Sequence, residues 1–282
     1  MTVKVAALQM RSSTSLERNI ADFEALVREA AGQGATYVQS PEMTGALVKD
    51  RAALRSMITS NEKDALVKRA GELAKELAIV VHVGSTAIAR SDGKVANRAF
   101  VFGPDGALAA TYDKIHMFDV DLDNGESWRE SATYEPGKQS TVVDLPFGRT
   151  GLAVCYDLRF PQLFRAQALA GASVLTVPAA FTRQTGEAHW HVLLRARAIE
   201  NGAFVIAAAQ GGKHEDGRET FGHSMIVDPW GRILAEADGD VPGVVIAEID
   251  IGEVAKARGK VPNLKNGRDF TVAETGGLRN AS

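Results

Sequence analysis

The single cysteine of the chain, Cys155, lies where an apolar run changes to a polar corner. Residues 151–154 predict a buried strand, and Pro161, whose fixed φ suits the first turn of a helix, predicts a helix over residues 162–170. Cys155 is therefore expected between a strand end and a helix, where layered α/β proteins form ligand crevices. A thiol at this position is a candidate nucleophile. The alternative is an inert core residue, because free cysteine is among the most buried residue types.

Two other residues have the chemical types that a cysteine nucleophile needs. Glu42 follows a predicted strand at residues 37–41, and Lys114 follows a predicted hairpin. A free thiol has a pKa of roughly 8.5 and needs a neighbouring base or ammonium group to react near neutrality. Glu42 can accept the proton of Cys155, while Lys114 and the next backbone N–H can stabilise an oxyanion. Considered singly, each charge is also compatible with a solvent-exposed position.

The elements that would position these residues recur in two halves of the chain. Helical periodicity over residues 19–31 precedes the first copy of a strand, and the helix after Pro161 precedes the second. Each hairpin signal is an apolar strand followed by a Pro-x-Gly turn. The matching segments are 34–41 with 171–178, 79–84 with 204–209, and 100–106 with 225–231.

This repeated order of strands and helices predicts an α/β fold, a four-layer α-β-β-α sandwich with two pseudo-symmetric halves. Two independent domains are the alternative, but no Pro/Ser-rich or low-complexity linker separates the halves. We therefore expect one domain over residues 1–282, with a C-terminal tail from about residue 271. Residues 46–61 and 119–136 break the pattern and are expected to form loops or short helices that carry function.

Composition excludes several classes of partner. The chain has 282 residues, of which 45% are hydrophobic and 24% charged, and its formal net charge is −3. This balance gives no support for binding of nucleic acid or an anionic membrane surface. No apolar stretch is long enough to span a bilayer, and the first residues lack the pattern of a signal peptide. With a single cysteine and therefore no intrachain disulfide, we expect a cytoplasmic protein.

The residues singled out so far resemble the Glu-Lys-Cys signature of the nitrilase superfamily of carbon–nitrogen hydrolases. The resemblance is closest to the Nit branch of amidases, and it implies the same four-layer fold and catalytic roles for Glu42, Lys114 and Cys155. Thr44 departs from the pattern, since many relatives have an aromatic residue there. The segments that carry the resemblance are 41–42, 114–116, 155–161, 181–190, 193–200 and 222–231.

The family also has a second glutamate between the lysine and the cysteine. Glu130 fits that motif, and Glu126 and Glu135 are its competitors. The implied reaction is hydrolysis of a small carboxylate-bearing primary amide to an acid and ammonia through a thioester, most similar to deaminated glutathione amidases. The alternatives are an ω-amidase acting on 2-oxoglutaramate or succinamate, a nitrilase, or a carbamoylase.

The resemblance implies no metal or organic cofactor. His189 and His191 are two residues apart and would diverge on a helix, and no clustered cysteines complete a zinc site. His82, in an apolar run, is expected to be a hydrogen-bonded core histidine. The helix that carries His189 is expected to begin near Gly186.

A carboxylate-bearing substrate requires a cation at some distance from the thiol, and guanidinium groups suit carboxylates. Arg159 and Arg183 are candidates because both follow predicted strand ends, and Tyr156 is a candidate binding residue beside the nucleophile. The alternatives are a structural ion pair for Arg159 and a surface charge for Arg183. The expected binding partner is a small-molecule amide.

We also expect a homodimer. The resemblance and a set of apolar residues that follows the nucleophile motivate this expectation, because two-fold pairing commonly covers exposed apolar patches. Packing within one subunit is the alternative. The set consists of Leu158, Phe160, Leu163 and Phe164.

Two other classes of function compete with an amidase. A papain-type protease would pair Cys155 with a histidine, but the Cys-Gly-x-Cys-Trp type of context is missing. A catalytically silent scaffold is the other, and the intact set of glutamate, lysine and cysteine argues against it.

Overall fold

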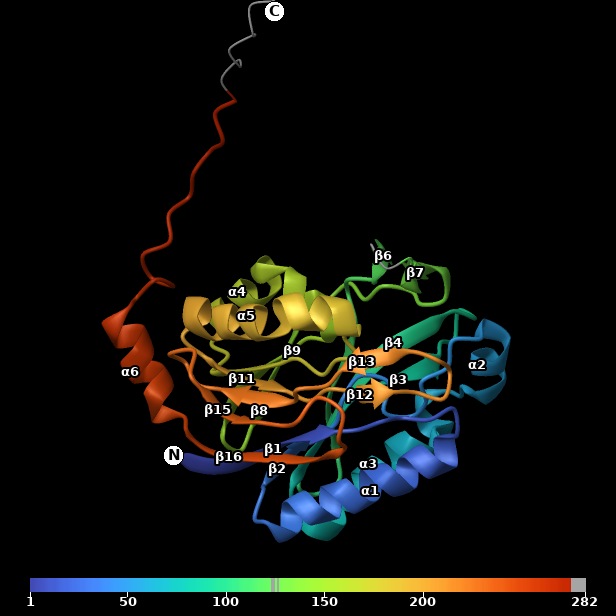
Figure 1. Cartoon of the computed structure of the whole chain (residues 1–282). Helices are drawn as coiled ribbons and strands as arrows, with labels where there is room; N and C mark the ends of the chain where they lie inside the picture. Colours follow the sequence, from blue (N-terminus) through green and yellow to red (C-terminus); the bar gives the residue numbers. More distant parts are fainter. Residues whose placement is uncertain (123–124, 126, 275–282) are drawn as a thin grey trace, which may run out of the picture.

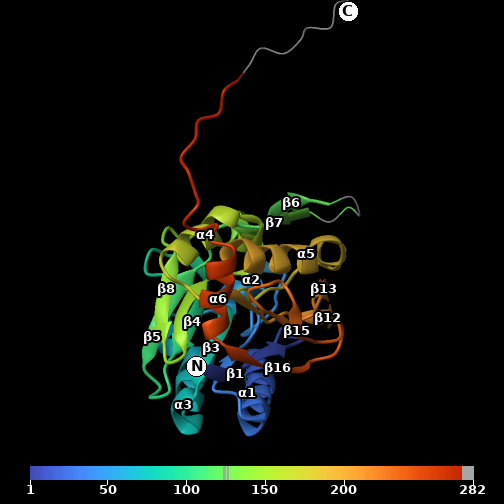
Figure 2. The same ribbon diagram turned by 90° about the vertical axis from the view of Figure 1, so that its left-hand side faces the viewer.

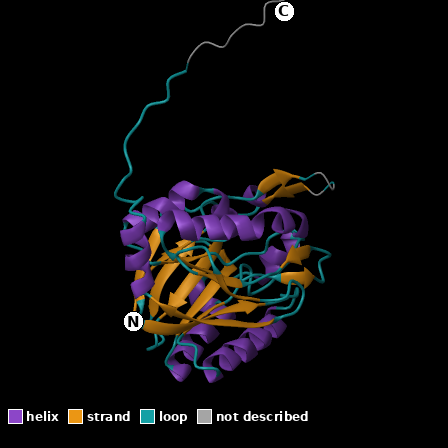
Figure 3. Ribbon diagram, turned by 60° about the vertical axis from the view of Figure 1, so that its left-hand side comes forward, coloured by secondary structure: helices purple, strands orange, loops and turns teal. Residues whose placement is uncertain are grey.

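The structure is a computed structural model, and it describes residues 1–122, 125 and 127–274. Two six-stranded sheets lie face to face at its centre, and helices cover the outer face of each sheet (Figure 1). Coloured by secondary structure, the strands lie between two layers of helices (Figure 3). The predicted four-layer α-β-β-α sandwich is therefore confirmed.

The first sheet belongs mainly to the N-terminal half. Its outer face is covered by α1 (Leu16–Gly32) and α3 (Ala65–Leu77), whose first turns are capped by the side chains of Ser15 and Asp64. The parallel pairs are β1 with β2 and β2 with β3, and the other pairs are antiparallel. The strand order is β16 (Gly243–Asp250), β1 (Thr2–Gln9), β2 (Tyr37–Gln39), β3 (Val80–Ala89), β4 (Val95–Phe102) and β5 (Leu108–Asp113).

The second sheet repeats this plan with the C-terminal half. Its helices are α4 (Pro161–Leu169), which has a proline in its first turn, and α5 (Arg183–Asn201), which ends at Gly202 in the left-handed region. Here β9, β10 and β11 pair in parallel, and the rest are antiparallel. The order is β8 (Thr141–Leu145), β9 (Gly148–Leu152), β10 (Val174–Thr176), β11 (Phe204–Ala207), β14 (Met225–Val227) and β15 (Ile233–Glu236).

The two halves are therefore equivalent strand by strand. In each sheet, three parallel strands are followed by two antiparallel ones, and one further antiparallel strand, β16 or β8, borders the first parallel strand. A single apolar cluster joins the facing sides of the sheets, and it contains Tyr37 from the first and Leu152 and Val205 from the second. The carboxyl ends of β1 and β11 lie close together, since Met10, which follows β1, forms a bridge with Gln210, three residues after the end of β11.

Smaller elements gather near one end of the sandwich. Figure 1 shows α2 and the hairpins β6–β7 and β12–β13 toward the same side of the molecule. Among their described residues, the segments expected to be loops or short helices thus contain the short helix α2, the short hairpin β6–β7 and the 3-10 turn η2, and η1 begins at the end of the first segment. The bounds are α2 (Arg51–Met57), η1 (Asn61–Lys63), β6 (Asp119–Asp121), β7 (Ser127–Arg129), η2 (Glu130–Ala132), η3 (Cys155–Arg159), β12 (Gly211–Lys213), β13 (Glu219–Phe221) and α6 (Gly252–Lys260).

After α6 the chain runs away from the sandwich without forming a helix or strand up to residue 274 (Figure 2). The tail expected from about residue 271 continues into residues 275–282, which lie outside the described residues. In the part of the chain that the structure describes, no helix is both long enough and apolar enough to cross a bilayer.

Two local expectations need correction. The helix expected near Gly186 begins earlier, at Arg183. Three of the four apolar residues after the nucleophile form no surface patch, because Leu158 and Phe164 are fully buried and Leu163 is 6% exposed; the fourth, Phe160, is half-buried and stacks on His116. The three buried side chains pack into the core of their own subunit, and they no longer support an exposed dimer face.

Candidate active site

Cys155 lies at the corner between β9 and α4. The strand ends at Leu152, and Cys155 begins η3 with φ +50°, a left-handed conformation that is rare for a residue with a side chain. Its backbone N–H donates to the carbonyl oxygen of Pro178 at 2.9 Å, at the end of the adjacent β10 region. Such a conformation costs on the order of 1–3 kcal/mol and persists where the surroundings impose it, as at functional corners.

Asp157 imposes part of this geometry. Its carboxylate is fully buried and accepts from the Val154 N–H at 2.8 Å and from the Tyr112 hydroxyl at 2.7 Å. The other oxygen accepts from the His116 N–H at 3.1 Å and contacts His116 Nδ1 at 2.6 Å. One buried carboxylate therefore connects the corner of Cys155 to the segment that carries Lys114.

Glu42 follows β2 on an equally constrained turn. The next residue, Met43, has φ +56°. The turn passes so close to Gly84 that a Cβ atom there would collide with the carbonyl oxygens of Ser40 and Pro41. Thr44, the departure from the family pattern, donates through its hydroxyl to the Pro41 carbonyl at 2.7 Å. Thr44 is thus fully buried and stabilises this turn.

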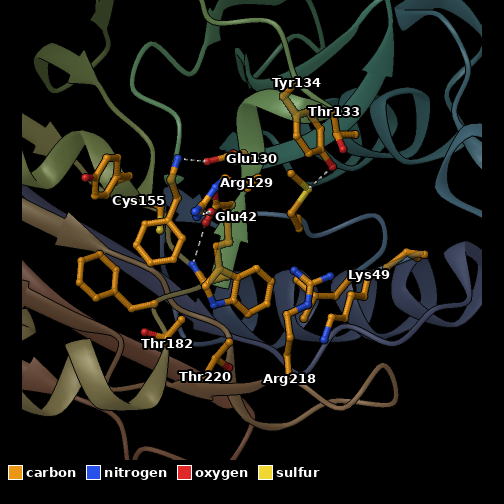
Figure 4. A pocket seen from close by; sticks show the side chains of 18 of the residues that line it. Glu42, Lys49, Arg129, Glu130, Thr133, Tyr134, Cys155, Thr182, Arg218 and Thr220 are labelled. Carbon is orange, nitrogen blue, oxygen red and sulfur yellow. Dashed lines mark hydrogen bonds between the residues drawn. The ribbon is translucent and has the colours of Figure 1, made fainter. Parts of the chain in front are cut away.

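Lys114 brings the charged groups together. Its Nζ donates to Glu42 Oε1 at 2.9 Å and to Glu130 Oε1 and Oε2 at 2.9 and 2.8 Å, and its side chain is only 2% exposed. Figure 4 shows Glu42 and Glu130 close to Cys155. The expected association of Glu42, Lys114, Glu130 and Cys155 is therefore present as geometry, although these residues come from four separate segments.

Glu130 is the second glutamate of this group. It begins η2, and its Oε2 also accepts from the Phe118 N–H at 2.7 Å. Glu135 instead pairs with Lys94 at 2.8 Å, away from the group, and Glu126 lies outside the described residues.

Asn97 on β4 also holds the two carboxylates. Its Nδ2 donates to Glu42 Oε1 at 2.9 Å and to Glu130 Oε1 at 3.1 Å, and its side chain is buried. The remaining Glu42 oxygen accepts from the Ala180 N–H at 2.9 Å. Hydrogen bonds of this kind favour the charged form of a carboxylate. Asn97 was not anticipated from the sequence, where it is one polar residue in a strand.

Burial and the neighbouring charges shift the pKa values of Glu42, Glu130 and Lys114 in opposite directions. Burial is the largest single influence and disfavours the carboxylate of Glu42, but the Lys114 ammonium and the hydrogen bonds from Lys114, Cys155 and Asn97 together outweigh it, and the pKa of Glu42 is lowered. Burial raises the pKa of Glu130 despite the same ammonium group. Burial would neutralise Lys114, but the charges of Glu130 and Glu42 raise its pKa well above the usual value.

For the Cys155 thiol, burial and the nearest carboxylate act in the same direction, and both raise the pKa. Burial, together with the negative charge of Glu42, raises the pKa of Cys155 well above the usual value. The resting state is therefore a neutral thiol beside an ionised carboxylate, and not a preformed thiolate. This arrangement requires Glu42 to take the proton as the sulfur reacts.

A cavity of about 270 Å³ opens onto this group. Glu42, Lys114, Glu130 and Cys155 form its floor together, and Tyr156, the candidate binding residue, lies in its wall. The other aromatic side chains in the wall are Phe118, Trp128, Tyr134 and Phe181.

Neither arginine expected to bind substrate lines this cavity. The Arg159 guanidinium lies over the rings of Phe181 and Tyr156, at 5.4 and 6.0 Å, and contacts His189. Arg183 pairs with Asp240 and Glu219 on the surface. Besides Lys114 at the floor, the basic residues that line the cavity are Lys49, Arg51, Arg129 and Arg218.

The histidines also differ from expectation in detail. His191 diverges from its neighbour His189, but the fold brings it to His223 and Glu236, and the ligand atoms of these three lie within 4.8 Å of one another. Glu236 Oε1 contacts His191 Nε2 at 2.8 Å and His223 Nδ1 at 2.7 Å. Within the described chain this is the group whose donor types suit a divalent transition metal.

His82 is buried in the core, as expected, but only half of its hydrogen-bonding capacity is used. Its Nδ1 contacts the Tyr37 hydroxyl at 2.8 Å, and its Nε2 has no partner among the described residues. Burial lowers the pKa of His82 to about 3, so the ring is neutral near pH 7.

The fold and the site together define an enzyme of the hydrolase class: two stacked sheets hold a thiol, two carboxyl groups and an ammonium group at the floor of a cavity. The sequence pattern of the carbon-nitrogen hydrolase family matches residues 4–259. The chain belongs to the carbon-nitrogen hydrolase family.

Comparison with individual proteins agrees with this assignment. The chain is 40% identical to a deaminated glutathione amidase from Yersinia enterocolitica, over 94% of this chain and 92% of that protein. It is 35% identical to Omega-amidase NIT2 from Homo sapiens, over 96% of each.

A solved structure adds chemical information about a neighbour. The structure of a glutamate-to-glutamine mutant of the amidase from Nesterenkonia sp. AN1 is similar, with a TM-score of 0.77 and 25% identity over 90% of this chain and 92% of that chain. That structure is described as showing covalent addition of the acetamide moiety of fluoroacetamide at the active site cysteine.

Proposed function

We propose that the chain is a cysteine-dependent amidase that hydrolyses a small carboxylate-bearing amide through a thioester, and that Cys155, Glu42, Lys114 and Glu130 carry the reaction. The observation that supports this most directly is Lys114, which holds both carboxyl groups on one buried ammonium at the cavity floor beside Cys155. A thiol, a base and a cation in one water-poor site are the groups that covalent amide hydrolysis needs.

The first half of the reaction forms the thioester. Glu42 takes the proton of Cys155, and the sulfur attacks the amide carbon. Lys114 and the backbone N–H of Tyr156 stabilise the oxyanion, as preorganised donors do in acyl transfer. Glu42 then gives its proton to the departing nitrogen, the carbon–nitrogen bond breaks, and an amine or ammonia leaves.

The second half releases the acid. Glu42, again ionised, takes a proton from water, and the water oxygen attacks the thioester carbon. Collapse of the intermediate breaks the carbon–sulfur bond and returns the proton to Cys155. Glu130 positions Lys114 throughout, since both of its oxygens contact the Nζ. No step requires a metal or an organic cofactor.

The substrate proposed first is deaminated glutathione or a close analogue, which is what the name of the relative from Yersinia enterocolitica describes. The amide bonds of that molecule are secondary, so its cleavage would release an amine and not the ammonia expected for a primary amide. The alternative is an ω-amide, as the name of the human relative suggests. The basic residues of the cavity support an acidic substrate in either case.

Product analysis tests this proposal. Purified protein incubated with deaminated glutathione, 2-oxoglutaramate, succinamate and a simple nitrile is assayed for acid, amine and ammonia. We expect the amides to be cleaved, and the Cys155→Ala variant to be inactive. Turnover of the nitrile alone, or turnover that survives in Cys155→Ala, would contradict the proposed reaction.

We further propose a cytoplasmic homodimer whose only other partner is its small-molecule substrate. Exposed apolar residues on α5 and at the end of α4 support the dimer, since Val192, Ile199 and Leu169 are 69%, 53% and 63% exposed. Sedimentation at micromolar concentration measures the assembly. A mass near that of one chain, 30.1 kDa, would contradict the dimer.

A further inference from the structure

Apart from Lys114 at the floor, the basic side chains that line the cavity, Lys49, Arg51, Arg129 and Arg218, differ in whether their charge is already paired with a carboxylate. Arg129 donates through Nη2 to both oxygens of Asp121 at 2.9 Å, and its Nη1 donates to two backbone carbonyls. Lys49 and Arg51 have no carboxylate within 4.0 Å among the described residues. Arg218 is paired with a carboxylate through only part of its guanidinium. Its side chain is 20% exposed.

Hydrogen bonds to Asp216 hold Arg218 in place and leave part of its guanidinium without a hydrogen-bond partner among the described residues. Its Nε pairs with Asp216 Oδ2 at 2.6 Å, and its backbone N–H donates to Asp216 Oδ1 at 3.0 Å. The two Nη groups have no hydrogen-bond partner in the described part of the chain. A guanidinium that is fixed through Nε and free at both Nη presents the planar fork that binds a carboxylate bidentately.

Two of the cations that are not fully paired, Arg218 and Lys49, flank one ring. The Arg218 guanidinium lies 5.5 Å and the Lys49 Nζ 5.9 Å from the centre of the Trp128 ring, and Figure 4 shows both side chains at the same part of the cavity. Cation–π contacts of this kind restrict long side chains while leaving their charge available. Trp128 thus keeps two positive groups at one place on the wall.

A row of aromatic rings connects this place to the nucleophile. The Tyr156 ring, adjacent in sequence to Cys155, is 5.2 Å from Phe118, and Phe118 is 6.5 Å from Trp128. The floor itself, with two carboxyl groups against one ammonium, offers no surplus positive charge to an acidic substrate. An acidic amide would therefore be oriented with its amide at the floor and its carboxylate at the distant cations.

We propose that Arg218, assisted by Lys49 across the Trp128 ring, binds the carboxylate of the substrate remote from the scissile amide. This inference rests on the proposed amidase function, and it replaces Arg159 and Arg183 as the carboxylate-binding residues. In deaminated glutathione the carboxylate concerned belongs either to the acyl part or to the departing amine, and in 2-oxoglutaramate it belongs to the acyl part. Comparing the two substrates therefore shows whether the bound carboxylate belongs to the acyl part or to the departing amine.

The test compares kcat/KM of the wild type with Arg218→Gln, Arg218→Lys and Lys49→Met on deaminated glutathione, 2-oxoglutaramate and neutral pentanamide. A hydrogen bond to a charged group contributes roughly 1.5–3 kcal/mol, so Arg218→Gln should lower kcat/KM for the acidic amide about 10- to 150-fold. The loss should appear mainly in KM, since the contact is remote from the bond that breaks. Arg218→Lys should recover only part of the loss, and Lys49→Met should have a smaller effect.

Arg232→Gln is the matched control. Arg232 pairs through Nε with Asp228 at 2.6 Å, as Arg218 does with Asp216, but Arg232 is not among the residues that line the cavity. This control should retain wild-type kinetics on all three amides. A loss confined to deaminated glutathione assigns the carboxylate to the departing amine, and a loss on both acidic amides assigns it to the acyl part. Equal loss on pentanamide, or no loss on either acidic amide, overturns the inference.

A binding measurement separates this inference from the proposed reaction. Glutarate is titrated calorimetrically into Cys155→Ala protein, which cannot form a thioester, and into the same protein carrying Arg218→Gln. The inference predicts that Arg218→Gln weakens glutarate binding about 10-fold or more, by the same charged hydrogen bond. Unchanged glutarate binding, together with no selective loss of kcat/KM on deaminated glutathione, overturns it. If the wild type cleaves no amide while glutarate binding depends on Arg218, the proposed reaction fails and the carboxylate subsite stands.

Discussion

Replacement of Asn97 by leucine tests how the ionisation of the site is maintained. Leucine has a similar size, so Asn97→Leu removes the two hydrogen bonds to Glu42 and Glu130, at 2.9 and 3.1 Å, without opening a large space. Asn97 Oδ1 has no partner among the described residues, so no other hydrogen bond is lost. The donor favours the charged form of Glu42, and its removal should raise the pKa of that carboxyl group.

The effect on activity follows from the role of Glu42 as the base. A carboxyl group with a raised pKa is protonated at a higher pH, so the acid limb of the kcat/KM profile should move upward in Asn97→Leu. Loss of one hydrogen bond to a charged group, roughly 1.5–3 kcal/mol, corresponds to activity about 10- to 150-fold lower below the limb. The deficit should shrink as the pH rises toward the plateau, where Glu42 is ionised in both proteins.

The assay is a pH profile of kcat/KM with a neutral amide, so that substrate ionisation does not contribute. Asn201→Leu is the control, because Asn201 is also buried, donates to a backbone carbonyl at 2.9 Å and has no partner for its Oδ1 in the described structure. The control should lose stability without moving the limb. An Asn97→Leu profile that is lowered equally at every pH would refute the reasoning, since it would indicate a structural role alone.

Three further predictions concern the site and the core. Cys155→Ser, Glu42→Gln and Lys114→Met should each lower kcat by several orders of magnitude with the fold retained by circular dichroism, because groups that act as one unit have non-additive effects; activity within tenfold of the wild type would exclude the residue concerned. His82 has a pKa of about 3 when folded and about 6.5 when free, so the unfolded chain binds its proton first and stability should fall by up to about 2 kcal/mol between pH 6.5 and 5. Urea titrations should show a smaller fall in His82→Gln, and equal slopes would contradict this. Gly84→Ala should lower the melting temperature and the activity together, because its methyl group would displace the turn before Glu42; unchanged activity would show that the turn tolerates the shift.

The principal site residues were predictable because they follow regular elements. Cys155 and Glu42 each lie three residues after a strand of a parallel set, β9 or β2, and Lys114 follows a hairpin whose turn is evident in the sequence. The internal repeat, in turn, predicted which strands are equivalent. Strand ends, a hairpin turn and the internal repeat can all be recognised from short stretches of sequence, and the structure contains the elements that they predict.

The residues that sequence reasoning missed depend on long-range contacts. Asn97 lies between Ala96 and the charged Arg98 in β4 and would be taken for a solvent-facing position, but its partner Glu42 is 55 residues away along the chain. Arg218 precedes a short hairpin strand next to Asp216, which is also the pattern of an ordinary surface turn. Arg183 was misplaced for the converse reason, since α5 begins at that residue and its side chain pairs with Asp240.

The central claim is that Cys155 carries the acyl group during turnover. The most direct test is intact-protein mass spectrometry after rapid acid quenching of the wild type with a slowly hydrolysed amide, followed by peptide mapping. The account predicts a mass increase equal to the acyl part of the substrate, located on Cys155, formed and lost at rates compatible with kcat and absent from Cys155→Ala. An adduct on another residue, or full turnover without any adduct on Cys155 at the expected acylation rate, would contradict it.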